Sequence, residues 1–371
     1  MKMQKLTFDI DVTGACNLRC PCCPQGNIKD YHLPNGFLEP ELLARIVQKS
    51  ISESLVTGIS LFNWTEPLLH PKIHELVRIV QNAAIPCHLS SNLNLLPDAD
   101  AIMAAQPASF KISTSGFTQE VYGISHRGGD IARVKKHMVE LAAAKKRHNA
   151  DTRIFVNYHR YRDNLKEEPL MRAFAKGLGF DFEPAWALMF PLEKILTYVD
   201  EAAQDFPLTE EDHQLIDRLA LPLKKTLEFA QKYSSQPCSL RDSQVSIDFR
   251  GNVLLCCGIF DAVKYSIGNY MDMPLDEIQR IRQSHQMCGL CMRHGGHVYL
   301  TNRVPEMDEL LLNNIAPEDI SLLDLHREFA QTRRQQYFQR VYQKYLSGII
   351  SKKQKDALKN LMNRIQGVMT G

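Results

Sequence analysis

Four cysteines lie close together near the start of the chain, namely Cys16, Cys20, Cys22 and Cys23. Soft thiolates select iron–sulfur clusters or zinc. The spacing of Cys16, Cys20 and Cys23 lets a short loop wrap three thiolates around one corner of an iron–sulfur cubane, and three ligands leave one iron open to a small chelating molecule. The spacing favours Cys23 over Cys22 as the third ligand. A zinc loop and a set of unligated buried thiols are the alternatives.

A second group of five cysteines lies far along the chain. Cys238 and Cys256 precede a Cys-x2-Cys pair, Cys288 and Cys291, and these four thiolates predict a second metal centre. Zinc is again an alternative to iron. Cys257 follows Cys256 directly and points to the opposite face if this segment is a strand. It is a spare ligand, a hydrogen-atom donor or a buried thiol.

Strand-like and helix-like segments alternate through the first half of the chain. The strand candidates are residues 6–12, 57–62, 86–91, 109–115, 152–158 and 179–186. The helical patterns between them are residues 39–54, 72–83, 98–105, 130–147 and 165–177. Such alternation predicts a parallel sheet with right-handed crossovers, and about six units are fewer than a closed barrel needs. The predicted fold class is therefore α/β, a partial (β/α)6 barrel with its site in the loops after the strands.

The rest of the chain predicts three further parts. The barrel (1–192) is followed by a helical linker (193–235), a small cysteine-rich domain with a hairpin and a helix (236–300), and a basic helical C-terminal extension (301–371). Between residues 324 and 364, ten Lys or Arg residues stand against three acids. A solvated amphipathic cap and a surface for an anionic partner are the two interpretations.

The overall composition excludes several classes of protein. The 371 residues include 44 Lys and Arg against 42 Asp and Glu, and the net charge of +2 gives no reason to expect nucleic acid or a membrane surface as a partner. No apolar run reaches the ~18 residues of a membrane span, and no signal peptide is evident. We therefore expect a cytoplasmic protein whose ten cysteines are not paired in disulfides.

The motif Cys16-x3-Cys20-x2-Cys23 after the first strand resembles that of the radical SAM superfamily. The resemblance implies a [4Fe–4S] cluster on these three cysteines, with S-adenosylmethionine (SAM) chelating the unique iron. It also implies reductive cleavage of SAM to a 5′-deoxyadenosyl radical that abstracts a substrate hydrogen atom, while the protein positions the reactants and excludes water. Cys22 is a departure, because the family usually has an aromatic residue there.

Three segments at the ends of later strands extend the resemblance. Residues 63–67 (Asn-Trp-Thr-Glu-Pro) resemble the family's Gly-Gly-Glu-Pro segment with both glycines replaced, which implies that Glu66 accepts hydrogen bonds from the SAM ammonium. Residues 90–92 resemble its Thr-Asn-Gly segment, and residues 113–116 its Ser-x-Asp-Gly segment. The residues expected there at the ribose and the methionyl carboxylate are Ser91, Asn92, Ser113 and Ser115.

His126 and Arg127 belong to a segment that is similar to radical SAM proteins with auxiliary clusters. Together with Cys257 they are the candidate catalytic residues, expected to face the substrate. A satisfied surface pair is the alternative interpretation of His126 and Arg127.

The pattern Cys238-x12-Gly251-x4-Cys256 resembles the start of a SPASM domain. No cysteine follows Cys291, and His297 stands where the next one is expected. The shorter twitch domain, with one auxiliary [4Fe–4S] cluster on Cys238, Cys256, Cys288 and Cys291, is therefore the better match. The resemblance covers roughly residues 6–300.

The resemblance implies two [4Fe–4S] clusters, SAM, a small polar substrate and a reducing partner such as flavodoxin or ferredoxin. Loss of a hydrogen atom beside a hydroxyl, followed by loss of an electron to the auxiliary cluster, gives a ketone, whereas return of a hydrogen atom gives an epimer. A peptide-modifying enzyme is the second hypothesis, although the early first strand leaves no room for a preceding peptide-recognition domain. A non-catalytic iron–sulfur or zinc protein is the third, and it leaves Glu66 without a purpose.

Overall fold

The computed structural model describes residues 3–28, 34–200, 206–301, 304 and 306–341. By its contacts the chain divides into residues 1–315 and residues 316–371. Every strand of the described residues lies in the first of these units. The finer boundaries expected within it, at residues 192, 235 and 300, stay a prediction.

Nine strands form one sheet in the order β6-β5-β4-β3-β2-β1-β7-β8-β9. The strands are β1 (Lys5–Ile10), β2 (Leu55–Ser60), β3 (Cys87–Ser91), β4 (Ser109–Thr114), β5 (Arg153–Arg160), β6 (Asp181–Trp186), β7 (Gln244–Ile247), β8 (Asn252–Leu254) and β9 (Ser266–Asn269). Strands β1 to β6 pair in parallel with their neighbours. The expected partial barrel of six parallel strands is confirmed.

Alternation along these strands separates an apolar face from a polar one. On β1, Leu6, Phe8 and Ile10 are buried in the hydrophobic core. The residues of opposite parity, such as Asp9 on β1 and Lys111 on β4, line a cavity on the other face of the sheet. The curved sheet therefore has an apolar outside, covered by helices, and a polar inside.

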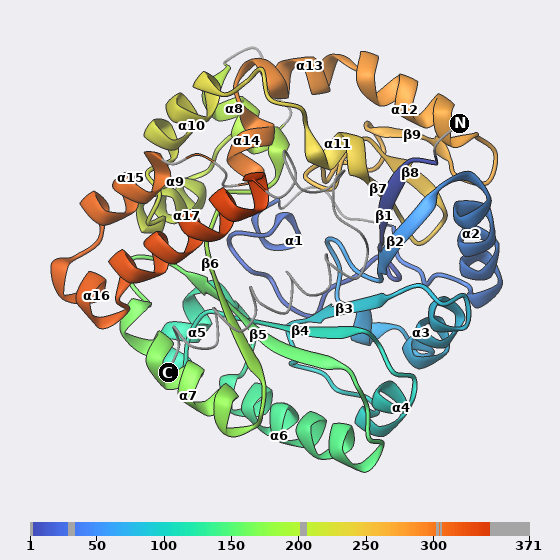
Figure 1. The fold of residues 1–371 in the computed structure, drawn as a ribbon, viewed down its shortest axis with the longest axis horizontal. Helices are drawn as coiled ribbons and strands as arrows, with labels where there is room; N and C mark the ends of the chain where they lie inside the picture. Colours follow the sequence, from blue (N-terminus) through green and yellow to red (C-terminus); the bar gives the residue numbers. More distant parts are fainter. Residues whose placement is uncertain (1–2, 29–33, 201–205, 302–303, 305, 342–371) are drawn as a thin grey trace. The chain divides into compact units, whose positions relative to one another are not determined.

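Helices cover the outer face of the sheet, while α1 lies on the inner side (Figure 1). The outer helices are α2 (Pro40–Glu53), α3 (Ile73–Asn82), α4 (Ala99–Ala104), α6 (Ile131–Arg147) and α7 (Glu168–Gly177). In α2 the buried residues Leu43, Ile46, Val47 and Ser50 recur at helical spacing, and Pro40 stands in the first turn, where its missing N–H costs nothing. These helices match the five expected from the sequence.

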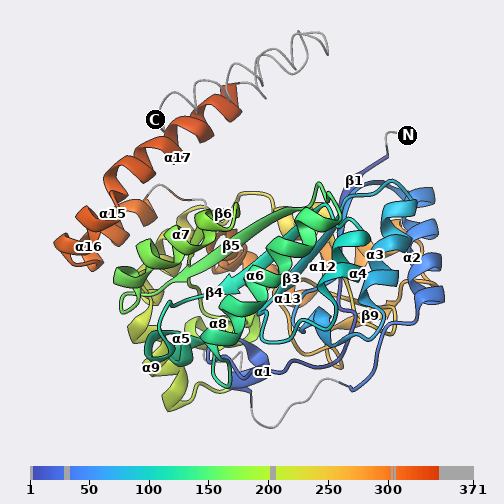
Figure 2. The same ribbon diagram turned by 90° about the horizontal axis from the view of Figure 1, so that it is seen from below.

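Short helices follow the loops after β1 and β4. These are α1 (Pro24–Asn27) and α5 (Gln119–Ser125), and they lie at the same edge of the sheet (Figure 2). The carboxyl ends of parallel strands meet at one edge, which is where α/β proteins place their sites. The cysteine loop before α1 therefore lies at the edge expected for chemistry.

Strand β7 continues the sheet on the far side of β1 and runs parallel to it. Strands β8 and β9 follow in antiparallel order. The turn between β7 and β8 contains Gly251 at a φ of 87°, and the Asp248 carboxylate accepts hydrogen bonds from the backbone N–H groups of Arg250 and Asn252 (both 2.9 Å). The hairpin expected in this region is confirmed, and it is joined to the barrel through the sheet itself.

The remaining segments of the chain are mostly helical. They are α8 (Leu192–Val199), α9 (Glu210–Arg218), α10 (Leu223–Lys232), α11 (Ser239–Ser243), α12 (Leu275–Ser284), α13 (Gln286–Arg293), α14 (Gly296–Thr301) and α15 (Glu306–Asn314), with α16 (Pro317–Leu322) and α17 (Leu325–Val341) in the second unit. The basic segment 324–364 begins in α17, and its part from residue 342 onward lies outside the described residues. Within the described part of the chain, no helix is both long and apolar enough to span a membrane.

Candidate functional site

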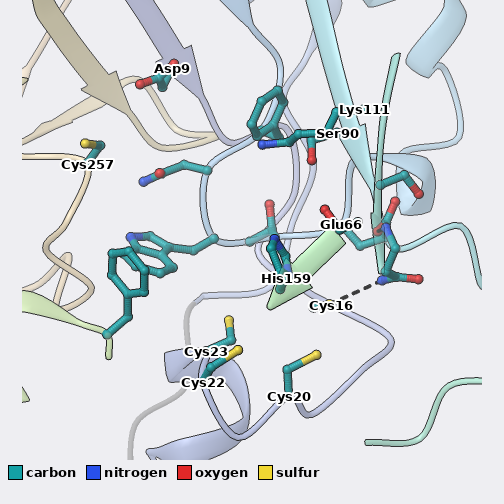
Figure 3. Close-up of a pocket in the computed structure, with 18 of the residues that line it drawn as sticks. Asp9, Cys16, Cys20, Cys22, Cys23, Glu66, Ser90, Lys111, His159 and Cys257 are labelled. Carbon is teal, nitrogen blue, oxygen red and sulfur yellow. Dashed lines mark hydrogen bonds between the residues drawn. The ribbon is translucent and has the colours of Figure 1, made fainter. Parts of the chain in front are cut away.

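The loop between β1 and α1 brings its four cysteines to one cavity. Cys16, Cys20, Cys22 and Cys23 all line a cavity of about 620 Å³ on the inner side of the sheet (Figure 3). The Cys23 N–H donates to the Cys20 carbonyl (3.0 Å), which closes the loop before α1. The Leu18 N–H donates to the Cys16 sulfur (3.5 Å). The spacing argument thus produces a compact loop with all its sulfurs on one side.

The thiols of this loop suit a metal centre electrostatically. Burial raises the pKa of Cys20 and Cys23 well above the usual range, and the neighbouring thiols raise it further. Thiolates crowded in this way are stable only beside positive charge, which soft metal ions supply. Cys22 differs, because its side chain makes a hydrogen bond with that of Tyr161. Cys16 also accepts a hydrogen bond, from the Leu18 N–H, so such a contact does not decide between Cys22 and Cys23, and the choice of Cys23 stays a prediction.

Asp11, one residue beyond the end of β1, holds the loop that contains Asn63, Trp64 and Thr65. One of its carboxylate oxygens accepts backbone hydrogen bonds from these three residues (3.0, 3.1 and 3.1 Å) and a fourth from the Thr65 hydroxyl (2.6 Å). A nest of backbone N–H groups binds anions, and here a side chain of the protein fills it. The loop therefore keeps a fixed shape without the two glycines of the resembling segment.

Glu66 lines the cavity directly after this loop. Its carboxylate accepts hydrogen bonds from the backbone N–H groups of Asn92 (2.9 Å) and Leu68 (3.1 Å). Burial raises its pKa to about 7, against the lowering effect of these hydrogen bonds. A cationic group entering the cavity would stabilise the charged carboxylate.

Three of the four residues expected at the strand ends lie at the cavity. Ser91, Asn92 and Ser113 line it, and the Asn92 side-chain amide also donates to Asn17 in the cysteine loop (2.8 Å). Ser115 is buried and does not line the cavity. Its hydroxyl hydrogen-bonds instead with Nδ1 of His126 (2.8 Å), so Ser115 orients a cavity residue.

The two candidates of the His126-Arg127 pair separate in the structure. His126 lines the cavity and stacks on Tyr122, with ring centroids 4.5 Å apart. Burial lowers its pKa to about 3, so it is neutral. Arg127 does not line the cavity. Its side chain is about half exposed and pairs with Glu211 (3.3 Å), while its carbonyl accepts from the Arg19 N–H in the cysteine loop (3.0 Å).

Sequence reasoning missed several polar residues that project from the strands into the cavity. They include Asp9, Ser60, Lys111 and His159. Strand alternation carries the signal that would have found them, since each has the parity opposite to its buried apolar neighbours. Tyr161 and Gln244 also line the cavity, and they come from a loop and from β7.

The later cysteines surround a second, smaller cavity. Cys238 precedes α11, Cys256 follows β8, and Cys288 and Cys291 lie one turn apart on α13, yet all four line this cavity. Burial raises the pKa of Cys238, of Cys288 (to about 11) and of Cys291. Within the described residues, no three His, Cys, Asp or Glu side chains form a group that could hold a single metal ion.

Two arginines near the second cavity carry the positive charge that crowded thiolates need. The Arg282 guanidinium donates to the backbone carbonyls of Leu255 (3.0 Å), Leu240 (3.0 Å) and Gln244 (2.5 Å), and it favours the charged form of the Cys288 thiol. Arg241 lines the cavity and acts in the same direction. The donor set is thus four thiols from three segments, and Arg282 joins the two segments that carry Cys238 and Cys256.

Neighbouring residues face the two cavities. Cys256 lines the four-cysteine cavity, whereas Cys257 lines the large cavity and contacts the Gln244 side-chain carbonyl (3.3 Å). Figure 3 shows Cys257 at the large cavity. Both cysteines lie beyond the end of β8 and their side chains make a hydrogen bond with each other, so the strand alternation expected of them does not apply. Cys87, the cysteine outside both groups, is buried in the hydrophobic core.

Trp64 connects the loop of the large cavity to the segment after Cys256. Its indole N–H donates to the Ile259 carbonyl (2.7 Å), and its ring packs edge-on against Phe190 and Phe260. A tryptophan in this position therefore ties the two cysteine sites to each other. Glycine at this position would make neither the hydrogen bond to Ile259 nor the ring contacts with Phe190 and Phe260.

Residues 10–163 match the family model described as "Radical SAM superfamily". The matched range contains the cysteine loop, Glu66 and the residues at the ends of β3 and β4. This part of the chain is therefore similar to the radical SAM superfamily. A search of curated proteins found no match.

Solved structures of radical SAM enzymes share the fold at low identity. SuiB of Streptococcus suis, bound to its precursor peptide SuiA, is 13% identical with a TM-score of 0.51, over 77% of this chain and 66% of SuiB. A histidine-tagged form of anSMEcpe with bound AdoMet is 17% identical with a TM-score of 0.50, over 87% of this chain and 99% of its own. BtrN in complex with AdoMet and 2-DOIA is 14% identical with a TM-score of 0.47, over 80% and 90%. The chain thus spans about two thirds of SuiB.

Similarity of residues 10–163 to the radical SAM superfamily implies one [4Fe–4S] cluster and SAM. The residues at the large cavity fit both groups. Cys16, Cys20 and Cys23 present buried thiols on one side of a compact loop, and the Glu66 carboxylate lies at the same cavity for the SAM ammonium. The part of each residue in binding stays a prediction that mutation can test.

Replacing Asp11 by alanine is expected to weaken SAM binding by about tenfold or more. The loop 63–65 would lose four hydrogen bonds to one carboxylate, each worth roughly 0.5–1.5 kcal/mol, and Glu66 follows directly on this loop. The measurement is the SAM dissociation constant of the reconstituted protein, by equilibrium dialysis. Asp11→Asn keeps one oxygen acceptor and is expected to lose less. Equal affinity of Asp11→Ala and wild type would contradict this role.

Asp100→Ala is the matched control for this experiment. Asp100 is an exposed aspartate bound to Arg147 (2.8 Å) and His148 (2.9 Å), far along the chain from the cysteine loop. Its replacement is expected to leave both the SAM dissociation constant and the iron content at the wild-type level. If Asp11→Ala loses iron while Asp100→Ala keeps it, Asp11 instead stabilises the cysteine loop that holds the cluster.

Proposed function

We propose that this radical SAM enzyme oxidises or epimerises a small polar metabolite, with a second [4Fe–4S] cluster as electron acceptor. The observation that carries the proposal is the arrangement of Cys256 and Cys257. Their side chains face the four-cysteine cavity and the large cavity respectively. A single peptide unit thus separates a predicted electron-accepting centre from the space where substrate would lie.

The donor sets of the two cavities support different roles. Three cysteines at the large cavity would leave one metal corner open, and SAM would occupy it. Four cysteines at the second cavity would saturate their cluster, whose chemistry when bound is the uptake and release of single electrons. Cys238, Cys256, Cys288 and Cys291 therefore suit an electron carrier, not a second SAM site.

The side chains of the large cavity determine what else can occur there. The reaction that suits them is removal of a hydrogen atom from a carbon beside a hydroxyl, followed by loss of an electron and a proton to give a ketone. Polar groups such as Ser90, Lys111 and His159 line the cavity and would orient a hydroxylated molecule. If the Cys257 thiol instead returns a hydrogen atom to the substrate carbon, the product is the epimer.

A peptide-modifying activity is the second candidate. It is supported by the fold shared with SuiB, which was solved with its precursor peptide. The number of charged and polar side chains in the cavity favours a small metabolite over a peptide. A flavodoxin or ferredoxin is the proposed source of electrons for SAM cleavage.

Iron and sulfide analysis tests this proposal together with a SAM-cleavage assay. Two clusters predict about eight iron atoms per chain after anaerobic reconstitution, and dithionite is expected to produce 5′-deoxyadenosine. A content of about four iron atoms per chain would mean a single [4Fe–4S] cluster and would contradict the proposed second one. Stoichiometric zinc with no SAM cleavage would instead support the non-catalytic protein.

A further inference from the structure

Two oppositely charged residues project from the sheet into the large cavity, on the side away from the cysteine loop before α1. Asp9 on β1 and Lys111 on β4 both line the cavity, and Figure 3 shows them at the opposite end from Cys20, Cys22 and Cys23. Both have the inward parity of their strands, because Phe8 and Phe110 beside them are buried in the core. Strand alternation therefore places both charged side chains on the inner face of the sheet.

Asp9 and Lys111 attract each other but do not form an ion pair in the part of the chain that the structure describes. Each changes the pKa of the other through charge, yet no contact within ion-pair distance joins them. The Lys111 ammonium lies over the Phe62 ring, 4.7 Å from its centroid. Another carboxylate that acts on Lys111, Glu183, is bound to Arg153 (2.6 Å).

Burying two opposite charges without direct contact between them is costly. Burial raises the pKa of Asp9 to about 6 and lowers the pKa of Lys111, so each charged form is disfavoured by desolvation. Asp9 makes a hydrogen bond with the neutral Ser60 side chain, while Lys111 compensates its charge only without direct contact and the Asp11 carboxylate opposes it. Buried charges are normally paired. A ligand with a cationic group for Asp9 and an anionic group for Lys111 would satisfy both at once with charge-assisted hydrogen bonds.

We propose that Asp9 and Lys111 form a substrate subsite for a small zwitterion, a free amino acid whose ammonium binds Asp9 and whose carboxylate binds Lys111. This subsite rests on the proposed function, since it names the class of small polar metabolite held in the large cavity. His159 and Ser90 line the same cavity and supply further hydrogen-bonding groups for the ligand.

Binding to the unreduced holoenzyme tests the subsite without turnover. The protein is reconstituted with iron and sulfide and saturated with SAM, which keeps the SAM site closed to the probes. Isothermal titration calorimetry then compares the proteinogenic amino acids. For the tightest binder, the amine that lacks the carboxylate and the acid that lacks the amino group are both expected to bind at least about tenfold more weakly.

Two variants assign the two ends of the ligand. Asp9→Asn is expected to weaken binding of the amino acid and of the amine by about tenfold or more, with little effect on the acid. Lys111→Met is expected to weaken the amino acid and the acid, with little effect on the amine. Lys136→Met, which removes an exposed lysine paired with Glu140 (3.7 Å) on α6, is the control and is expected to bind as wild type does.

The comparison of analogues on the wild-type protein needs no variant and stands even if a variant fails to fold. The proposal is overturned if no amino acid binds, if either partial analogue binds as tightly as the amino acid, or if both variants weaken every probe equally. Tighter binding of a tripeptide blocked at both ends would also overturn it in favour of a peptide. Adding dithionite to the same samples separates the two proposals, because absence of 5′-deoxyadenosine would contradict the proposed function alone.

Discussion

Replacing Cys23 by alanine is expected to reduce SAM cleavage to the background of the assay, while replacing Cys22 leaves it measurable. Cys23 completes the Cys16-x3-Cys20-x2-Cys23 set and follows the closed turn from Cys20. Without Cys23, only Cys16 and Cys20 would hold the [4Fe–4S] cluster. Two protein ligands are too few to retain it, so the cluster would be lost. Cys22 stands outside this spacing and is therefore expected to be dispensable. The readout is 5′-deoxyadenosine formed with dithionite, together with iron per chain.

The two variants are well matched, because both remove a buried thiol from the same loop. Cys23→Ala is expected to lose about four iron atoms, and Cys22→Ala is expected to keep them. Loss of cleavage in Cys22→Ala with retention in Cys23→Ala would show that the third ligand is Cys22. A thermal unfolding curve for each variant distinguishes loss of the cluster from loss of the fold.

Much of the barrel was predictable because its signals are local. Helical and strand periodicities alternate, and each predicted strand lies within two residues of an observed one at its start, as β4 (Ser109–Thr114) does for the range 109–115. The cysteine loop was predictable for the same reason, since its ligands lie within a few residues of one another. Covalent proximity alone brings Cys16, Cys20 and Cys23 to one side.

The rest of the site depends on which strands face each other across the curved sheet. Asp9 and Lys111 come from strands about a hundred residues apart, and nothing local in the sequence pairs them. The local pattern also predicted Ser115 and Arg127 at the cavity. In the structure, the Ser115 hydroxyl instead makes a hydrogen bond with His126, and the Arg127 side chain forms an ion pair with Glu211. A strand end specifies the edge of the sheet, while the backbone turn after it decides which side chain enters the cavity.

Removing two ligands of the second cavity is expected to separate the chemical steps. The double variant Cys288→Ala and Cys291→Ala should retain SAM cleavage and hydrogen abstraction but lose the oxidised product. The reason is ligation, because these cysteines lie on α13 and line the four-cysteine cavity, whereas SAM would bind at the large one. The measurements are 5′-deoxyadenosine and product in the same reaction, with about four iron atoms retained per chain.

Stability is the confounder of this double variant, because metal binding at such a site is often folding energy. Arg282 joins β7, α11 and Leu255, the residue after β8, through three backbone carbonyls. These bonds do not depend on the cysteines, so this part of the chain has support of its own. A soluble variant that keeps the first cluster but loses all SAM cleavage would mean that electrons reach the first site through the second. Unchanged product would mean that the second site is structural. The oxidation would then give way to a redox-neutral outcome, for which Cys257 at the large cavity is the available hydrogen-atom donor.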